Sequence, residues 1–266
     1  MTDKVEPERA GGYDPGVYAS LIAVEDRHFW FRARNQVISA LTSQVVAKLS
    51  PGYRVLEVGC GDGNVLRFLE QACPAGVVVG MDLYGEGLKY ARSRTSSLLV
   101  QGDASQAPFS KAFQVIGIFD VLEHLQDDQR ILRDLWELLE AQGTLLLTVP
   151  ARPELWSITD EAWGHCRRYR LEELRLKIEA AGYHVEYLTE YMASVYPLIW
   201  LNRRVRKKPT PGAGLSAEQL LQREVRIVPV FNQILSFLLS RETKRIAARK
   251  SLPFGASLLA VARKPG

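Results

Sequence analysis

Apolar positions along the chain follow two periods, and the change between them marks the predicted elements. Short apolar runs, typical of strands buried on both faces of a parallel sheet, alternate with stretches whose apolar residues recur every three or four positions, as in helices. This alternation predicts an α/β fold, a seven-stranded, mostly parallel sheet with helices on both faces. Strands are predicted near 53–58, 77–81, 97–100, 113–119, 143–149, 184–189 and 256–262, and helices near 64–73, 85–94, 127–141 and 171–181.

Two helical regions lie outside this alternation. Residues 17–48 have the apolar spacing of two helices, after a polar start that we expect to be disordered. The 64 residues of 191–254 separate the last two strands, where a hairpin needs about 2–5. Ser216 is predicted to open a helix that continues around Pro229, and we favour a roof over the substrate side, with a dimer contact as the alternative. The predicted units are 1–50 (tail and cap helices), 51–190 (core), 191–254 (helical insertion) and 255–266 (last strand).

Composition narrows the class of protein. Apolar residues make up 47% and charged residues 24% of the 266, with a mean hydropathy of −0.09, which is typical of a globular chain. The longest apolar run, 192–201, has 10 residues, against about 20 needed to cross a bilayer. The polar amino terminus is unlike a secretory signal. Cys60, Cys73 and Cys166 are too scattered for a disulfide framework or a zinc site, so a cytoplasmic location is predicted.

The net charge of +4 is mild, and its excess is local. Five of the six residues in 203–208 are Arg or Lys. This run is either a solvated linker or, with its apolar neighbours, a contact for an anionic membrane surface through 195–208. Nucleic acid is not an expected partner, because no aromatic platform is interleaved with the basic residues.

The most informative segment is 53–63, Tyr-Arg-Val-Leu-Glu-Val-Gly-Cys-Gly-Asp-Gly. Gly59, Gly61 and Gly63 allow a tight bend that brings bare backbone against a ligand at the carboxyl end of a strand. Asp82 ends the next predicted strand, where a carboxylate can accept hydrogen bonds from the two hydroxyls of a ribose. The segment therefore predicts a site for a nucleoside cofactor.

The details of the bend select among cofactors. The spacing Gly-x-Gly-x-Gly departs from the dinucleotide fingerprint, since Asn64 stands where the third glycine would fall, and no Gly-Lys-Ser or Gly-Lys-Thr triplet occurs. Glu57 and Asp62 would repel a pyrophosphate and suit a ligand with positive charges. That description fits S-adenosylmethionine.

The bend resembles the glycine-rich first motif of class I S-adenosylmethionine-dependent methyltransferases, of the type-11-like family that acts on small molecules. Residues 101–104 (Gln-Gly-Asp-Ala) resemble its adenine-binding acid motif, and 113–125 resembles its fourth strand and following loop, with the Leu-Glu-His of ubiquinone-pathway and many natural-product enzymes. Gln114 departs from the usual Asp, at a position beside the fold rather than in the chemistry. The resemblance covers roughly 53–190 and the last strand, and implies a Rossmann-like sheet with amino-terminal cap helices.

The resemblance also implies which residues hold S-adenosylmethionine and its product S-adenosylhomocysteine. Glu57 would bind the ammonium, Asp82 the ribose and Asp103 the adenine amino group. For each acid the alternative is a surface or helix-capping carboxylate. The full set of implied cofactor residues is Glu57, Gly59, Cys60, Gly61, Asp82, Leu83, Asp103, Ala104 and Phe119.

Catalytic residues are harder to predict, because methyl transfer mainly needs alignment of the reactants and exclusion of water. Glu123 and His124 follow the fourth strand, and His165 lies in the segment after the fifth. Each is a candidate base, and bracing of the loop is the alternative. Adjacent residues seldom point at one ion and no third ligand is evident in the sequence, so no metal is predicted.

Aromatic and basic residues in two segments are candidate substrate contacts. In 155–169 the tryptophans could wall an apolar pocket and the basic residues could clamp an anion, or the segment is simply a loop that leads into a helix. In the cap helices, aromatic residues could close over the cofactor or belong to the core. The candidates are Tyr18, His28, Phe29, Trp30, Trp156, Trp163, Arg167, Arg168 and Tyr169.

The predicted function is in-line methyl transfer from S-adenosylmethionine to a small, bulky, partly apolar molecule, such as a natural-product, quinone or lipid intermediate. A base would assist if the acceptor atom is oxygen or acidic carbon. The alternatives are a non-enzymatic cofactor-binding or scaffold subunit that keeps the fold, and a nicotinamide oxidoreductase. Both a monomer and a homodimer remain open.

Overall fold

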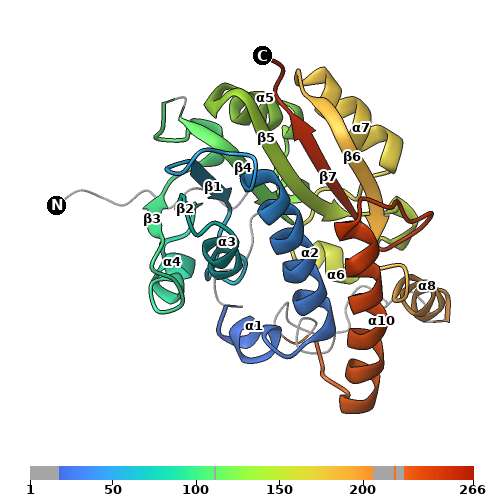
Figure 1. Cartoon of the computed structure of the whole chain (residues 1–266). Coiled ribbons are helices and arrows are strands. Elements are labelled where there is room, and N and C mark those ends of the chain that lie inside the picture. The colour runs from blue at the N-terminus through green and yellow to red at the C-terminus, as the bar shows by residue number, and fades with distance from the viewer. Residues whose placement is uncertain (1–17, 111, 206–218, 220–224) are drawn as a thin grey trace.

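The computed structural model describes residues 18–110, 112–205, 219 and 225–266, which form an α/β structure around one sheet of seven strands (Figure 1). The order is β3-β2-β1-β4-β5-β7-β6. Neighbours among β1 to β5 are parallel, and β7 is antiparallel to both β5 and β6. The predicted, mostly parallel seven-stranded fold is therefore confirmed. The strands are β1 (Arg54–Val58), β2 (Val77–Asp82), β3 (Leu98–Gln101), β4 (Phe113–Phe119), β5 (Leu139–Pro150), β6 (His184–Tyr191) and β7 (Ser257–Arg263).

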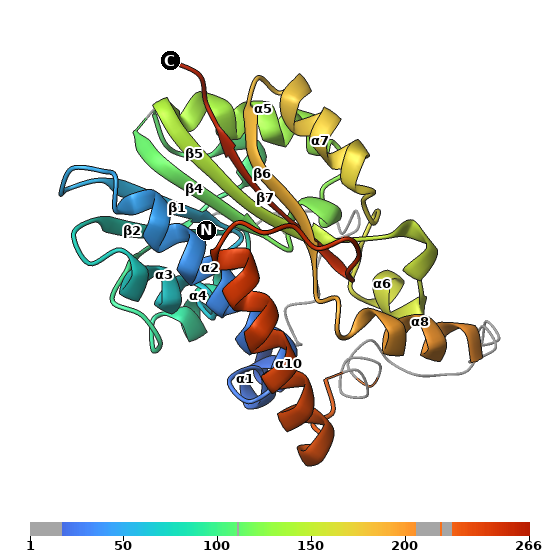
Figure 2. The ribbon, with the colours of Figure 1, turned by 45° about the vertical axis from the view of Figure 1, so that its right-hand side comes forward.

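Helices lie on both faces of the sheet (Figure 2). One face is covered by α2 (Phe29–Val46), α3 (Leu66–Ala72), α4 (Gly85–Ala91) and α10 (Pro229–Ala247), and the other by α5 (Asp128–Leu138) and α7 (Leu171–Ala180). The shorter helices are α1 (Tyr18–Glu25), α6 (Ile158–Ala162) and α8 (Tyr196–Val205), with 3-10 turns η2 (Ala104–Gln106), η3 (Leu122–His124) and η4 (Pro153–Leu155). No described helix has both the length and the apolar content to cross a membrane.

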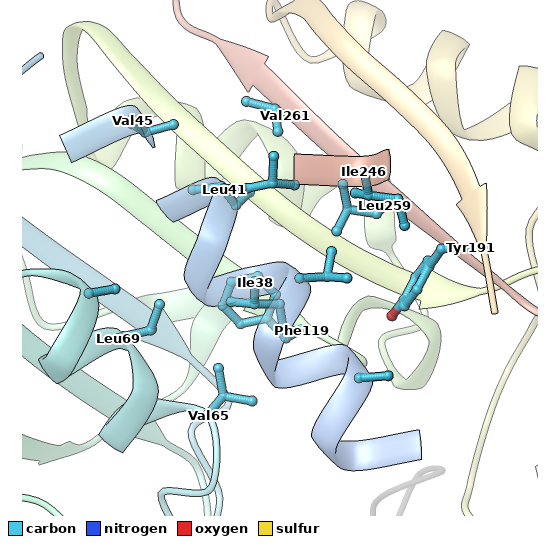
Figure 3. Close-up of a cluster of buried hydrophobic side chains, with 14 of the residues drawn as sticks. Ile38, Leu41, Val45, Val65, Leu69, Phe119, Tyr191, Ile246, Leu259 and Val261 are labelled. Carbon is cyan, nitrogen blue, oxygen red and sulfur yellow. The ribbon is translucent and has the colours of Figure 1, made fainter. Parts of the chain in front are cut away.

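The strands separate the two cores because successive side chains point to opposite faces. Val55 and Val115 belong to the cluster under α2, α3 and α10, shown in Figure 3, whereas Leu56 and Ile116 belong to the cluster under α5 and α7. Both positions in each pair are apolar, as expected for strands covered on both sides. Each fully buried aliphatic side chain of this kind stabilises the fold by about 1.5–3 kcal/mol.

Helix α10 of the insertion completes a layer of the core. It runs along α2 (Figure 1). Leu235, Leu239 and Ile246 are buried in the same cluster as the α2 side chains, and Figure 3 shows Ile246 in this cluster. The Gln44 side-chain amide also donates to the Ala247 carbonyl at 2.6 Å. Within 191–254, this helix is thus part of the core rather than of a separate unit.

Several predicted boundaries were wrong. The predicted helix 127–141 ends at Leu138, because the chain extends there to pair Leu139 with Phe113 across a register shift, which lengthens β5. Pro229 opens α10 instead of lying inside a longer helix, as its missing N–H and fixed φ favour. The predicted helix start at Ser216 and the predicted disordered start of the chain lie outside the described residues.

Candidate functional site

The glycine bend lies between β1 and α3, at the carboxyl edge of the sheet. Gly59, Gly61 and Gly63 all have positive φ, at 75°, 52° and 79°. A Cβ atom on Gly59 would lie 2.4 Å from Cγ2 of Val121, so no larger residue fits there without displacing the chain after β4. The bend is therefore both a backbone cradle and a contact between the ends of β1 and β4.

Asp82 links the bend to the end of β2. Its Oδ2 accepts a hydrogen bond from the Gly61 amide at 2.7 Å, and its Oδ1 accepts one from the Tyr84 amide at 2.8 Å. Burial raises the pKa of this carboxyl, and the two amide donors oppose that shift. The carboxylate is thus fixed at the strand end, where the ribose was predicted to bind.

Glu57 is the least satisfied acid of the bend. It is 2% exposed, and its Oε2 has no hydrogen-bond partner among the described residues. Burial raises its pKa well above the usual range, against the opposing charge of Arg34. A buried carboxylate oxygen without a donor is costly, and a ligand ammonium would supply both donor and charge. The orphaned oxygen and the glycine cradle fit S-adenosylmethionine.

The remaining cofactor candidates lie along the same edge. Asp103 caps η2, where its Oδ1 accepts from both the amide and the hydroxyl of Ser105 at 2.8 Å. Leu83 is exposed directly after β2, while Cys60 and Phe119 are buried at the ends of β1 and β4. Adenine binding by Asp103 and Ala104 stays a prediction.

The aromatic candidates of the amino-terminal helices lie in two places, over the glycine bend and at the start of α2. The Tyr18 ring lies over the bend, with Cε1 3.4 Å from the position that a Gly61 Cβ would take. His28 instead caps α2, and its Nδ1 accepts from the Trp30 amide at 3.3 Å. Burial lowers the pKa of His28 to about 4, so this ring is neutral at pH 7. Phe29 and Trp30 pack against the core.

An ion pair that we did not predict joins α2 to the end of β4. The Arg34 guanidinium lies 3.1 Å from Asp120 Oδ2, and the Thr148 hydroxyl donates to Asp120 Oδ1 at 3.1 Å. Asp120 has a φ of 55°, in the left-handed region. Arg34 also donates to Asn64 in the bend. The one available signal in the sequence was the position of Asp120 directly after the fourth strand.

A second cluster of titratable groups lies after β4 and β5. His165 Nε2 is 3.9 Å from Glu123 Oε1, and the rings of His165 and His124 are 4.8 Å apart at 82°. The Cys166 amide donates to the Glu123 carbonyl at 2.7 Å, which holds the two segments together. Burial raises the pKa of Glu123, and burial together with the neighbouring His165 lowers that of His124 to about 3. All three candidate catalytic residues therefore meet.

Asp160 is the residue of this cluster that sequence reasoning missed. Its Oδ1 lies 3.0 Å from His165 Nδ1 and accepts from Arg168 Nε at 2.6 Å, while its Oδ2 lies 3.4 Å from a nitrogen of Arg203 in α8. Burial alone would raise its pKa, but the hydrogen bonds from His165 and Arg168 outweigh burial and hold the pKa well below its usual range. Asp160 is therefore an anion that orients His165.

The predicted anion clamp is occupied by internal partners. Tyr169 has no exposed surface, and its hydroxyl donates to Asp128 at 2.9 Å. Arg167 pairs with the same carboxylate at 2.8 Å, and Arg168 is held by Asp160 and by the Ala151 carbonyl. These contacts are those expected from the alternative, a loop that is tied down ahead of α7.

The two tryptophans of the loop differ in environment. The Trp156 indole is partly exposed and donates to Glu161 at 3.2 Å. Trp163 lies with its ring centroid 6.3 Å from that of His165. Trp163 is thus the one of the two that the structure places beside the titratable cluster.

Comparison with known proteins identifies the family. Residues 30–188 match the model of a family described as a methyltransferase domain. A probable S-adenosylmethionine-dependent methyltransferase of Mycobacterium tuberculosis is 28% identical over 160 residues, which cover 59% of this chain and 56% of that protein. A ubiquinone biosynthesis O-methyltransferase of Xanthomonas campestris is 34% identical over 107 residues, or 37% of this chain and 43% of that protein.

The fold agrees over nearly the whole chain. A Haloferax volcanii methyltransferase, solved in complex with the Trm112 methyltransferase activator, superposes with a TM-score of 0.58 and 18% identity, covering 93% of this chain and 94% of that one. Among the curated relatives the match is shorter, and the chain spans about half the length of those it matches. With the family match over 30–188, these findings show that the chain belongs to the methyltransferase-domain family, among the class I S-adenosylmethionine-dependent methyltransferases.

Proposed function

We propose that this chain transfers the methyl group of S-adenosylmethionine to a small, partly apolar molecule. The observation that carries the proposal is the buried Oε2 of Glu57, which has no partner among the described residues and lies at the start of the glycine bend. An ammonium there would supply both the missing hydrogen-bond donor and a compensating positive charge, whereas a neutral ligand could supply only a donor. The family to which the chain belongs supports the same cofactor.

The residues of the bend have binding and orienting roles in this proposal. Glu57 receives the ammonium, Asp82 accepts from the ribose hydroxyls, and Gly59 and Gly61 let the backbone approach. Bound S-adenosylmethionine supplies an activated methyl group on a sulfonium with a neutral leaving group. The chain therefore has to hold the acceptor in line and keep water out. The Tyr18 ring, which lies over the bend, would help to exclude water.

His165 is the proposed base if the acceptor atom is oxygen or acidic carbon. Its Nδ1 proton is directed to Asp160 at 3.0 Å, which leaves the lone pair of Nε2 facing the space beside Glu123. A base in this position accelerates proton removal by about 10²–10⁴-fold. His165→Ala is therefore expected to lower turnover by that order and to leave the affinity for S-adenosylhomocysteine unchanged. Equal turnover in the variant and the parent would assign His165 a structural role.

The acceptor class is proposed from the walls of the site and from the relatives. Trp163 offers an apolar surface beside the titratable cluster, and one relative is named as a ubiquinone biosynthesis O-methyltransferase. We therefore favour a bulky acceptor with an oxygen nucleophile, such as a quinone, natural-product or lipid intermediate. A cytoplasmic site of action remains part of the proposal.

Contact with a membrane surface also remains a proposal. In α8, Leu198, Trp200 and Leu201 are exposed, and the Arg204 guanidinium lies over the Trp200 ring at 4.5 Å. Exposed apolar and basic side chains on one helix support interfacial binding. The rest of the basic run, 206–208, lies outside the described residues.

Two measurements test the proposed function. Calorimetry with S-adenosylhomocysteine is expected to show one site, and NAD is expected not to bind. Incubation with extracts and methyl-labelled cofactor, followed by untargeted mass spectrometry, is expected to show a small molecule that gains the label. Binding without any labelled product would favour the scaffold alternative, and absence of binding would overturn the proposal.

A further inference from the structure

A buried carboxylate and two imidazoles converge at the carboxyl end of β4. One oxygen of Glu123 and one ring nitrogen each of His124 and His165 all lie within 4.8 Å of one another. The Glu123 side chain is 1% exposed, and its Oε2 has no hydrogen-bond partner among the described residues. A buried carboxylate left in this state is costly, so the cluster is incomplete as protein alone.

His165 has the hydrogen-bond arrangement that is usual for a metal-bound histidine, with a carboxylate on the ring nitrogen that does not face the metal. Its Nδ1 lies 3.0 Å from Asp160 Oδ1, which places the proton on Nδ1 and leaves a lone pair on Nε2. That Nε2 lies 3.9 Å from Glu123 Oε1. A carboxylate on the far nitrogen of the ring fixes the tautomer and raises the basicity of the ligand.

We propose that Glu123, His124 and His165 bind one divalent transition-metal cation. Two imidazoles with one carboxylate suit Fe²⁺, Co²⁺ or Zn²⁺ better than Mg²⁺ or Ca²⁺, which prefer oxygen ligands. Ligand bonds of about 2.0–2.2 Å let two ligand atoms lie at most about 4.4 Å apart, so the three side chains close slightly around the ion. No metal was predicted from the sequence, because Glu123 and His124 are adjacent and no third ligand was evident. The fold brings His165 to them from the loop after β5.

The surroundings of the cluster favour a cation. The negative charges of Asp120 and Asp160 add to burial in raising the pKa of Glu123, and the Arg168 guanidinium opposes this shift. Arg168 is itself paired with Asp160, and Asp120 with Arg34. The His165 side chain is 12% exposed, which leaves an approach for a further ligand.

The consequence for the substrate rests on the proposed function. A cation in this position would bind an oxygen of the acceptor and lower the pKa of that hydroxyl, so that the oxygen reacts after its proton has passed to solvent. His165 would then act as a ligand rather than as the base. The acceptor would accordingly be an alcohol, phenol or carboxylic acid rather than an amine.

Titration of the metal-stripped full chain with Co²⁺ tests the site, since the visible absorption of the ion reports imidazole ligation without any turnover. One equivalent is expected to bind and to raise the temperature of unfolding. Glu123→Gln and His165→Ala are expected to abolish the spectrum, and Asp160→Asn to weaken binding by roughly 10- to 100-fold. His184→Ala, which changes an exposed histidine of β6, is the matched control and should bind as the parent does.

The outcomes separate this inference from the proposed function. If S-adenosylhomocysteine binds but no Co²⁺ spectrum forms, or if the spectrum survives in both ligand variants, the metal site is refuted and the methyltransferase proposal stands. If Co²⁺ binds as expected but S-adenosylhomocysteine does not, the cofactor proposal fails instead. Circular dichroism of Glu123→Gln and His165→Ala checks that each variant is folded. If one of them is unfolded, His165→Asn is used in its place.

Discussion

The two sides of the site are built in different ways. The proposed cofactor side, after β1 and β2, consists of a backbone bend with Gly59 and Gly61 and the acids Glu57 and Asp82, all close in sequence. The proposed acceptor side, after β4 and β5, consists of side chains that the fold brings together from distant segments, such as His165 with Glu123. Changes on the first side should therefore alter affinity for the cofactor, and changes on the second should alter turnover.

The largest expected effect on cofactor affinity is that of Gly59→Ala. The residue has a φ of 75°, and its new Cβ would lie 2.4 Å from the stiff Val121 side chain, so the bend must move. We expect S-adenosylhomocysteine affinity to fall by about 3 kcal/mol or more, on the order of 100-fold. Gly52→Ala is the matched control, since Gly52 has a φ of 90° but nothing within 4 Å of the added atom. Equal affinity in the two variants would show that the bend does not hold the cofactor.

Glu57→Gln should raise the stability of the cofactor-free protein and lower its affinity for S-adenosylhomocysteine. Burial raises the native pKa of Glu57 above 4.5, so as the pH rises past 4.5 the unfolded chain loses this proton first and folding becomes less favourable. The amide cannot ionise, and the cofactor-free variant should therefore be more stable than the parent at pH 7. Its S-adenosylhomocysteine affinity should fall by about 1.5–3 kcal/mol. Thermal unfolding across pH and calorimetry measure the two effects, and a variant that is less stable and binds normally would contradict both.

Asp82→Ala is expected to have a smaller effect on the same side. It removes the proposed acceptor for the two ribose hydroxyls and the internal bond to the Gly61 amide. Affinity for S-adenosylhomocysteine should fall by about 1–3 kcal/mol, with little change in the rate at saturating cofactor. Calorimetry and saturation kinetics check this, and unchanged affinity would remove Asp82 from the site.

The smallest expected effect comes from α8, which lies beside α6 in Figure 2 and contacts the acceptor side through Arg203. Arg203 lies 3.4 Å from Asp160, whereas Arg204 points at the exposed Trp200 ring. Arg203→Ala should loosen Asp160 and lower turnover by about 1 kcal/mol, or several-fold, without changing cofactor affinity. Arg204→Ala is the control with parent-like turnover, and equal effects of the two changes would disconnect α8 from the acceptor side.

The difference between the two sides of the site also explains which features the sequence could predict. A bend that needs positive φ at Gly59, Gly61 and Gly63 is written in consecutive residues, and buried strands are written as apolar runs. Pairing between distant charges cannot be read in this way, because Arg34 and Asp120 are 86 positions apart. Two adjacent arginines, Arg167 and Arg168, are typical of a site that binds an anion. Only the fold shows that they already pair with Asp128 and Asp160.

Strand β7 has a consequence for the order of folding. It is the last strand of the chain, yet it lies between β5 and β6 and supplies hydrogen bonds to both. On the ribosome, β6 therefore has no neighbour in the sheet until residues 257–263 have left the exit tunnel. Until then the outer edges of β5 and β6 expose unpaired backbone groups, which makes the nascent chain prone to aggregation at this point.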